Sequence, residues 1–480
     1  MRILLSMTPA SPFGLAPHPK TMSEESISRR SKCMATAAKT SRASSRLTVG
    51  ASACDSHEKC CVLCVMPQAL PLLTERARLR SSLVEGCVCG ARTAVRRSVA
   101  RWKFTTARRE HATPSRGGSA CITPPFDDVR ESVTTILTRF LETEGDTLGA
   151  IAPEAADLAA LLTGFLEGGK CLRPMFVHAG ACAANPSHGA ADANDVATLG
   201  AAVELVQAAA LIHDDVLDHS PTRRGRPAIH AAATHAHEAR NLAGSAEDFG
   251  IATAVILGDL ALALAHQLAS HAFAGADDRA HFQALCAEVM TGQYLDILNQ
   301  SGAITSTKSA TDSASLVTRW KTVSYTVHRP LMIGATRCDA SPALLESLGA
   351  YALPAGEAFQ LRDDLDGVFG DEAALGKSTS SDIREGKRTM LLALAQERAG
   401  ETERSVLAAT VGNSDADTES IERVREIMTA TGARESVENL IRQREDDARE
   451  VIANELSSLT SNESCKLLDS LVRKLARTDR

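Results

Sequence analysis

The sequence predicts an all-α protein whose main part is a single helical-bundle domain. Three observations favour this fold class. Aromatic residues make up only 3% of the chain, which is unusual for a β-sandwich or a β-barrel. From Phe126 onward, long segments rich in Ala and Leu repeat apolar residues at helical spacing. Strand-like alternation bounded by turn residues is nearly absent from the same region.

Residues 1–123 differ in composition from the rest of the chain. They contain 20 Lys and Arg but only 7 Asp and Glu, a net charge of +13; because the whole chain carries −7, residues 124–480 carry −20. This Ser- and Arg-rich stretch has no sustained period, so we expect a disordered, Cys-containing extension without an assigned function. A transit peptide is the alternative interpretation. A zinc site is disfavoured, because Cys87 and Cys89 form a Cys-x-Cys pair rather than Cys-x-x-Cys.

The composition also limits the partners and the compartment. The acidic charge of residues 124–480 argues against nucleic acid as a partner. We expect no transmembrane segment, because the best apolar run, 199–212, is interrupted by Glu204 and Gln207. The cysteines after residue 123 are scattered and odd in number, which predicts reduced thiols in a cytoplasmic protein. They are Cys171, Cys182, Cys286, Cys338 and Cys465.

The predicted domain covers residues 124–480 and begins at the pair Pro124–Pro125. Apolar periodicity predicts helices over 129–141, 196–217, 251–269, 281–298, 316–334, 342–369 and 389–396, with two more beginning near 420 and 436. The Gly- and Ser-containing breaks at 241–250, 301–315 and 411–418 are predicted to be loops.

Two acidic clusters end two of these apolar helices. In the first cluster, Asp214 and Asp218 are four residues apart and therefore lie about 6 Å apart along one helix face. Like charges at this spacing repel each other, so they need a cation. Oxygen ligands in this arrangement suit magnesium that carries a diphosphate. The second cluster, Asp363 and Asp364, follows Phe359 and Gln360. One such cluster could simply be a solvated helix end. Two acidic clusters in one helical domain instead favour a cavity in which they face each other across a magnesium–diphosphate complex.

Basic residues occur along the chain where a phosphate group would need them. Lys170 and Arg173 precede the first acidic cluster, and Arg223 and Arg224 follow it. Lys321 and Thr322 begin another helical segment, and a Gly-rich region after the second cluster contains Lys377 and Lys387. Each of these side chains alone would most simply be a solvated surface charge. Their order, alternating with the acidic clusters, favours a diphosphate site.

These motifs resemble those of trans-isoprenyl diphosphate synthases, the polyprenyl synthetase family, and are similar to bacterial geranylgeranyl diphosphate synthases. The resemblance covers residues from about Phe126 to the C-terminus. It depends on Gly-Lys-x-x-Arg-Pro, Asp-Asp-x-x-Asp with Arg-Arg-Gly, Lys-Thr and Phe-Gln-x-x-Asp-Asp. It implies the isoprenoid synthase type of helical bundle, with a central cavity. The implied reaction condenses isopentenyl diphosphate with dimethylallyl, geranyl or farnesyl diphosphate by magnesium-assisted ionisation, condensation and elimination.

The resemblance also implies residue roles. Magnesium, three ions per active site, would be held by Asp214, Asp218 and Asp363, with Asp215 and Asp364 in support. The allylic diphosphate would be held by Arg223, Lys321, Gln360, Lys377 and Lys387. The catalytic set would be Lys321, Thr322 and Gln360, the last two presenting oxygens to the allylic cation. Isopentenyl diphosphate would be bound by Lys170, Arg173, Gln207 and Arg224. The enzyme would be a homodimer.

Three positions depart from the family pattern. Cys171 stands where a second basic residue is usual, and Gln207 stands where many relatives have His. Gly367 replaces the last Asp of the second acidic motif, with Asp366 beside it. We expect activity despite these departures, because Gln can also donate to phosphate and Asp363 carries the main metal contact.

The alternatives are a class I terpene cyclase and a non-catalytic regulatory subunit of a heteromeric prenyl synthase. A cyclase needs no isopentenyl diphosphate site and has a different second metal motif. A regulatory subunit tends to lose an acidic motif, whereas this chain has both. Product length should depend on the helix that precedes Asp214. The growing product is expected to run along this helix, away from the metals. Ala209 and Ala210, one turn before Asp214, are too small to block a farnesyl chain, and Val206, Gln207 and Ala202 lie further along. Geranylgeranyl diphosphate is therefore the expected product.

Overall fold

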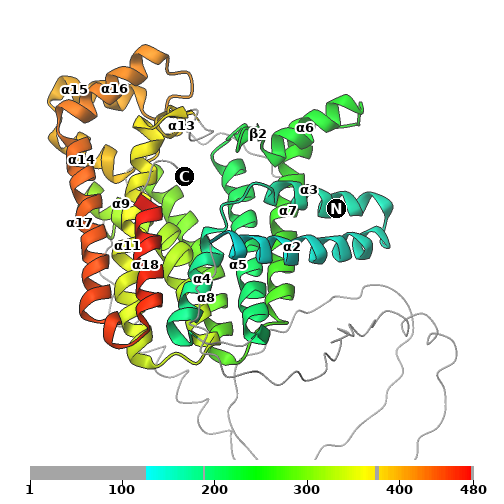
Figure 1. The fold of residues 1–480 in the computed structure, drawn as a ribbon. Helices are drawn as coiled ribbons and strands as arrows, with labels where there is room; N and C mark the ends of the chain where they lie inside the picture. The colour runs from blue at the N-terminus through cyan, green and yellow to red at the C-terminus, as the bar shows by residue number, and fades with distance from the viewer. Residues whose placement is uncertain (1–125, 187–189, 373–377, 477–480) are drawn as a thin grey trace, which may run out of the picture. The chain divides into compact units, whose positions relative to one another are not determined.

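The structure is a computed structural model that describes residues 126–186, 190–372 and 378–476. The predicted extension, residues 1–123, and Lys377 lie outside these residues. The described part is helical apart from one short hairpin, β1 (Thr222–Arg223) paired antiparallel with β2 (Arg226–Pro227). Figure 1 shows long helices running side by side, with shorter ones at one end of the bundle. The prediction of an all-α fold is confirmed.

The N-terminal half contains η1 (Pro153–Ala155) and six α-helices: α2 (Phe126–Gly149), α3 (Ala156–Leu166), α4 (Leu172–Ala184), α5 (Ala190–Leu217), α6 (Ile229–Ala239) and α7 (Ala246–Ala269). It is followed by α8 (Ala276–Gln300), α9 (Ala310–Val317), the π-helix η2 (Thr318–His328), α10 (Arg329–Arg337) and α11 (Pro342–Phe369). The C-terminal part contains α13 (Ser381–Arg384), α14 (Met390–Arg398), α15 (Glu401–Thr410), α16 (Thr418–Ala430), α17 (Ala433–Asn454), η3 (Leu456–Ser458) and α18 (Asn462–Ala476).

The three predicted loops end where a side chain caps the next helix. Ser245, Ser309 and Asp417 accept hydrogen bonds from backbone N–H groups three residues later, at 3.2, 3.0 and 2.9 Å. Such caps satisfy donors that a helix N-terminus leaves without a partner. The helices therefore begin at 246, 310 and 418, inside or at the end of the predicted breaks 241–250, 301–315 and 411–418.

Helix α5 is the central helix of the largest core cluster. Leu199, Leu205 and Ile212 on α5 are fully buried, together with Leu257 of α7 and Phe282 of α8. By length and composition, two helices could cross a membrane: 192–217 of α5, whose most apolar window is 78% buried, and α7, whose window is 39% buried. The burial of α5 is that of a core helix. Helix α7 instead exposes apolar side chains on one side.

The segment 316–334, predicted as one helix, is interrupted by a π-helix. After α9, η2 runs for 11 residues and then continues as α10. π-Helices are rare in proteins, and those that occur are often found at functional sites. Helix α8 approaches η2 closely at Gly292, where an added Cβ would lie 2.4 Å from the backbone nitrogen of Lys321. A larger residue at 292 would therefore push η2 away from α8.

Candidate active site

A cavity of about 1770 Å³ opens among α5, α8, η2 and α11. It is lined by most of the residues that the sequence singled out: Lys170, Arg173, Gln207, Asp214, Arg223, Arg224, Lys321, Thr322, Gln360, Asp363, Asp364 and Lys387. Residues more than 200 positions apart in the chain thus meet at one site. Asp215 and Asp218 belong to the same cluster as Asp214 but are not among the lining residues, and both are almost fully buried.

The first acidic cluster lies at the C-terminal end of α5, where the helix dipole disfavours negative charge. The amine of Lys321 compensates: its Nζ lies 3.2 Å from Asp214 and 2.6 Å from Asp296 of α8. Gln293 of α8 also donates to Asp214. Burial opposes ionisation of Asp214, but Lys321, with help from Lys387 and Gln293, holds its pKa below the usual value. Asp214 is therefore an ionised carboxylate at neutral pH.

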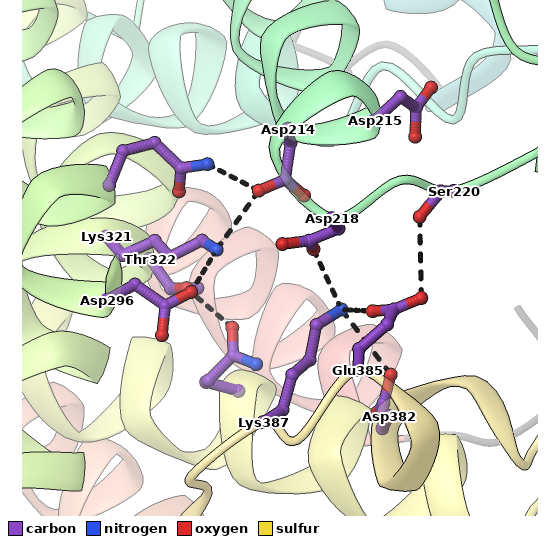
Figure 2. Close-up of polar contacts among 12 residues, drawn as sticks. Asp214, Asp215, Asp218, Ser220, Asp296, Lys321, Thr322, Asp382, Glu385 and Lys387 are labelled. Carbon is purple, nitrogen blue, oxygen red and sulfur yellow. Dashed lines mark hydrogen bonds and ion pairs between the residues drawn. The ribbon is translucent and has the colours of Figure 1, made fainter. Parts of the chain in front are cut away.

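Asp218 and Asp215 have different surroundings. Burial and the neighbouring Asp214 raise the pKa of Asp218 to about 6. Asp215 lies about a quarter-turn around the helix and accepts hydrogen bonds from Arg223, the Nε at 2.9 Å. Figure 2 shows the Asp215 carboxylate directed away from both lysines of the site. The structure thus brings Asp214 and Asp218 together and places Asp215 against Arg223.

Lys387 forms the second ionic centre. Its Nζ lies 2.9 Å from Glu385, 3.4 Å from Asp218 and 3.5 Å from Asp382 (Figure 2). Burial favours the neutral amine, but the three carboxylates raise the pKa of Lys387 well above its usual value. The first acidic cluster is thus connected through Lys387 to the turn that follows α13.

The second acidic cluster lies near the C-terminal end of α11. Gln360 accepts a hydrogen bond from the Thr322 hydroxyl at 2.5 Å and donates to Asp364 at 2.7 Å. Gly367, which replaces the family's last Asp, lies against α13: an added Cβ would be 2.0 Å from Oδ2 of Asp382. Asp382 therefore occupies the space beside α11 that a side chain at 367 would fill.

The π-helix η2 connects the two ends of the site. Lys321 and Thr322 reach α5, α8 and α11, as described above. Further along, Ser324 donates to Glu288 of α8, Tyr325 donates to Gln207 of α5, and Thr326 accepts from Arg173 of α4 at 2.8 Å. Within six residues, side chains of η2 therefore contact four different helices.

A second basic group lies at the Tyr325 end. The guanidinium of Arg173 lies 4.1 Å from the centre of the Tyr325 ring, and its Nε is buried without a hydrogen-bond partner. Arg224 donates to the backbone oxygens of Phe165 and Glu167 at 3.3 and 3.2 Å. Lys170 lines the same part of the cavity. Arg173 and Arg224 both act on the charge of Glu204, so with Lys170 they form a second cationic group that lines the cavity.

Sequence reasoning missed four polar residues of the site. Gln293 and Asp296 are three apart on α8, so they share a face, but such a pair also fits a solvated helix surface. Asp382 and Glu385 lie in the region recognised only for its lysines. Only the i,i+3 spacing of Gln293 and Asp296, in a helix that ends near a predicted loop, could have indicated from sequence that these two residues belong to the site. Among the residues with assigned positions, no three His, Cys, Asp or Glu side chains form a ready metal site. The lysines lie between the carboxylates instead.

A helical cavity with two acidic helix ends and two groups of basic side chains defines an all-α enzyme that acts on diphosphate esters. The comparison with known families agrees. The chain belongs to the polyprenyl synthetase family, whose model matches residues 156–428. It is therefore a trans-prenyltransferase.

Named relatives include synthases of several product lengths. The chain is 29% identical over 271 residues to geranylgeranyl diphosphate synthase of Saccharolobus solfataricus, covering 55% of this chain and 74% of that protein. It is 30% identical over 272 residues to (2E,6E)-farnesyl diphosphate synthase of Mycobacterium bovis, covering 55% and 68%. A structure of geranylgeranyl pyrophosphate synthase from Corynebacterium glutamicum, complexed with isoprenyl diphosphate and magnesium, matches at 37% identity with a TM-score of 0.69. That match covers 74% of this chain and all of the other.

Proposed function

We propose that this enzyme condenses isopentenyl diphosphate with an allylic diphosphate and that its main product is geranylgeranyl diphosphate. The observation that carries the reaction is the division of one cavity into two cationic regions. Lys321 and Lys387 lie among carboxylates at one end, and Lys170, Arg173 and Arg224 lie at the other. Two regions suit two diphosphate substrates, as condensation requires.

The acidic end would hold the allylic diphosphate with magnesium, which the family generally uses. The donor set fits this ion, because the available groups are hard carboxylate oxygens. Burial and repulsion from Asp214 both raise the pKa of Asp218, and a bound cation would oppose both effects. Asp214, Asp218 and Asp363 would hold three ions, with Asp364 in support. Asp215 would support through Arg223, which it orients. Bound magnesium would neutralise the leaving diphosphate.

The chain's own groups would then bind and orient the substrates. Lys321, Lys387 and Arg223, together with Lys377, would hold the allylic diphosphate. The hydroxyl of Thr322 and the amide oxygen of Gln360 lie 2.5 Å apart, so together they would present oxygens to the cation that forms when the diphosphate leaves. Lys170, Arg173, Arg224 and Gln207 would hold isopentenyl diphosphate on the opposite side. The released diphosphate would accept the final proton.

Product length should follow from the walls below the acidic end. Ala210 lines the cavity, whereas Ala209 and Val206 are fully buried. On α8, Val289 lines the cavity and Phe282 is fully buried. Phe282 does not line the cavity and packs against His266 and Phe273 instead. The small side chain of Ala210 in the cavity wall supports a product longer than farnesyl diphosphate.

The exposed apolar side chains support a homodimer. On α7, Phe249, Val255 and Ile256 are 42, 41 and 57% exposed, and on α8 Tyr294 and Ile297 are 60 and 41% exposed. Large apolar side chains left exposed on long helices are typical of residues that an interface covers. A second copy would cover it. We also place the enzyme in the cytoplasm, since none of the five cysteines that the structure describes forms a disulfide.

Turnover of radiolabelled isopentenyl diphosphate with farnesyl diphosphate tests the reaction. Asp214→Ala should lower kcat by at least a thousandfold. It should leave the helical circular dichroism intact, because Lys321 keeps its ion pair with Asp296 and Asp214 contributes nothing apolar to the core. Asp128→Ala, at an exposed position of α2, is the matched control and should retain full activity. Near-normal turnover by Asp214→Ala would refute the proposed function.

A further inference from the structure

Glu204 is a buried acidic residue within the basic part of the cavity. It lies on α5, ten residues before Asp214, lines the cavity and is only 5% exposed. Within the described part of the chain its carboxylate forms no ion pair within 4.0 Å, although Arg173 and Arg224 act on its charge. Buried polar groups nearly always have a partner, and an unsatisfied one is costly. Because Glu204 lines the cavity, its carboxyl group is open to whatever fills that space, whether water or a bound substrate.

The nearest cationic side chains are engaged elsewhere. Glu204 and Arg224 both lie close to Gly169. A Cβ added at 169 would be 3.6 Å from Oε2 of Glu204 and 3.8 Å from Nη1 of Arg224. Arg224, however, donates to backbone oxygens of α3 and the following turn, and Arg173 donates to Thr326. The carboxyl group thus lies close enough to both arginines to feel their charges, without an ion pair shorter than 4.0 Å to either.

We propose that Glu204 contacts isopentenyl diphosphate directly, as a neutral carboxylic acid whose O–H donates a hydrogen bond to a phosphate oxygen. This inference rests on the proposed function, which places the diphosphate between Lys170, Arg173 and Arg224. An ionised carboxylate would repel that diphosphate. A proton taken from solvent removes the repulsion and converts the carboxyl oxygen into a donor. Diphosphate binding at this site is therefore coupled to uptake of one proton.

The surroundings of Glu204 support this protonation. Burial raises the pKa of Glu204, and this effect exceeds the opposing attraction of Arg173 and Arg224. The other titratable groups that interact with it are Cys171 and Tyr325. Burial raises the pKa of Cys171 to about 12 and raises that of Tyr325, so neither titrates near neutral pH. A bound anion raises the Glu204 pKa further. Because binding takes up a proton, affinity should fall as pH rises.

Two substitutions separate this role from a structural one. Glu204→Gln keeps the shape and an N–H donor but cannot titrate, and Glu204→Ala removes the donor. The dissociation constant for isopentenyl diphosphate is measured by calorimetry on the full chain without allylic substrate, between pH 6.5 and 8.5. We expect Glu204→Ala to weaken binding about tenfold or more, as loss of a hydrogen bond to a charged group implies. Glu204→Gln should weaken it less than threefold and remove the proton uptake seen with wild type in buffers of different ionisation enthalpy.

The outcomes are distinct. Weakening by Glu204→Gln as large as by Glu204→Ala would show that the site needs an ionised counter-ion for its arginines, and would overturn the proposal. Equal proton uptake by wild type and Glu204→Gln would also overturn it, since that uptake would belong to the diphosphate. The comparison of wild type with Glu204→Gln still tests the proposal if Glu204→Ala does not fold. The exposed Glu131→Gln serves as control. Wild-type turnover is measured first, and its absence would refute the proposed function instead.

Discussion

Gly367 offers the sharpest test of how the second acidic cluster is built. In the interior of a helix, Gly→Ala normally stabilises by about 0.5–1 kcal/mol. At Gly367, however, the new Cβ would lie 2.0 Å from Oδ2 and 2.9 Å from Cγ of Asp382. Asp382 is 7% exposed and pairs with Lys387, so it can move only by weakening that contact.

The expected cost follows from overpacking a buried site, about 1–3 kcal/mol, which exceeds the gain in helix propensity. At about 2.1 cal/mol/K per residue, the described domain unfolds with an entropy of roughly 0.7 kcal/mol/K, so a net loss of about 1–2 kcal/mol lowers Tm by about 1.5–3 °C. Gly349→Ala on the same helix is the matched control, because its new Cβ would meet only His328, at 3.7 Å. Gly349→Ala should raise Tm slightly.

Differential scanning calorimetry of the two single variants at one scan rate measures both shifts. Turnover should fall in Gly367→Ala but not in Gly349→Ala, since displacement of Asp382 disturbs Lys387. Adding Asp382→Ser to Gly367→Ala removes the obstructing carboxylate and should recover part of the lost Tm. Equal melting temperatures for Gly367→Ala and Gly349→Ala would refute the close packing of Asp382 on α11.

Three further predictions follow from the cavity, the first acidic cluster and the N-terminal region. Ala210→Phe, which fills the cavity wall, should shorten the product to farnesyl diphosphate, whereas Ala209→Phe should mainly destabilise the core by about 1–3 kcal/mol; chromatography of dephosphorylated products and thermal melts separate the two. Because the pKa of Asp218 is about 6 without metal, the carboxylate that magnesium needs is lost as pH falls through 6. The Tm increase produced by magnesium and a non-hydrolysable diphosphate should therefore shrink from pH 7.5 to 5.5. Asp218→Asn should show a smaller increase with a weaker pH dependence, because only the diphosphate then titrates in this range. Deletion of residues 1–120 should leave turnover and solubility as they are, and loss of activity or of bound zinc in the truncated protein would contradict the dismissal of its cysteines.

The sequence predicts those parts of the site that depend on local spacing. Asp214 and Asp218 share a helix face because they are four residues apart, and the structure places them together. The position of Asp215 against Arg223 depends on the β1–β2 hairpin, which apolar periodicity does not reveal. Asp382 could not be found from sequence because its place depends on contact between α11 and α13 at Gly367. The π-helix was missed for a related reason: its packing against Gly292 of α8, not its own composition, accompanies the change of helical geometry.

The π-helix also constrains how the enzyme can change. Lys321 and Thr322 serve the proposed allylic end of the cavity, whereas Tyr325 and Thr326 contact the residues proposed for isopentenyl diphosphate. Because all four lie in one rigid segment, a deletion that returned it to α-helical geometry would rotate both sets of side chains at once. Substitutions that shift this segment should therefore alter the KM values of both substrates together. Independent tuning of either substrate would have to arise on the surrounding elements, such as α4, α5, α8 or α11, instead.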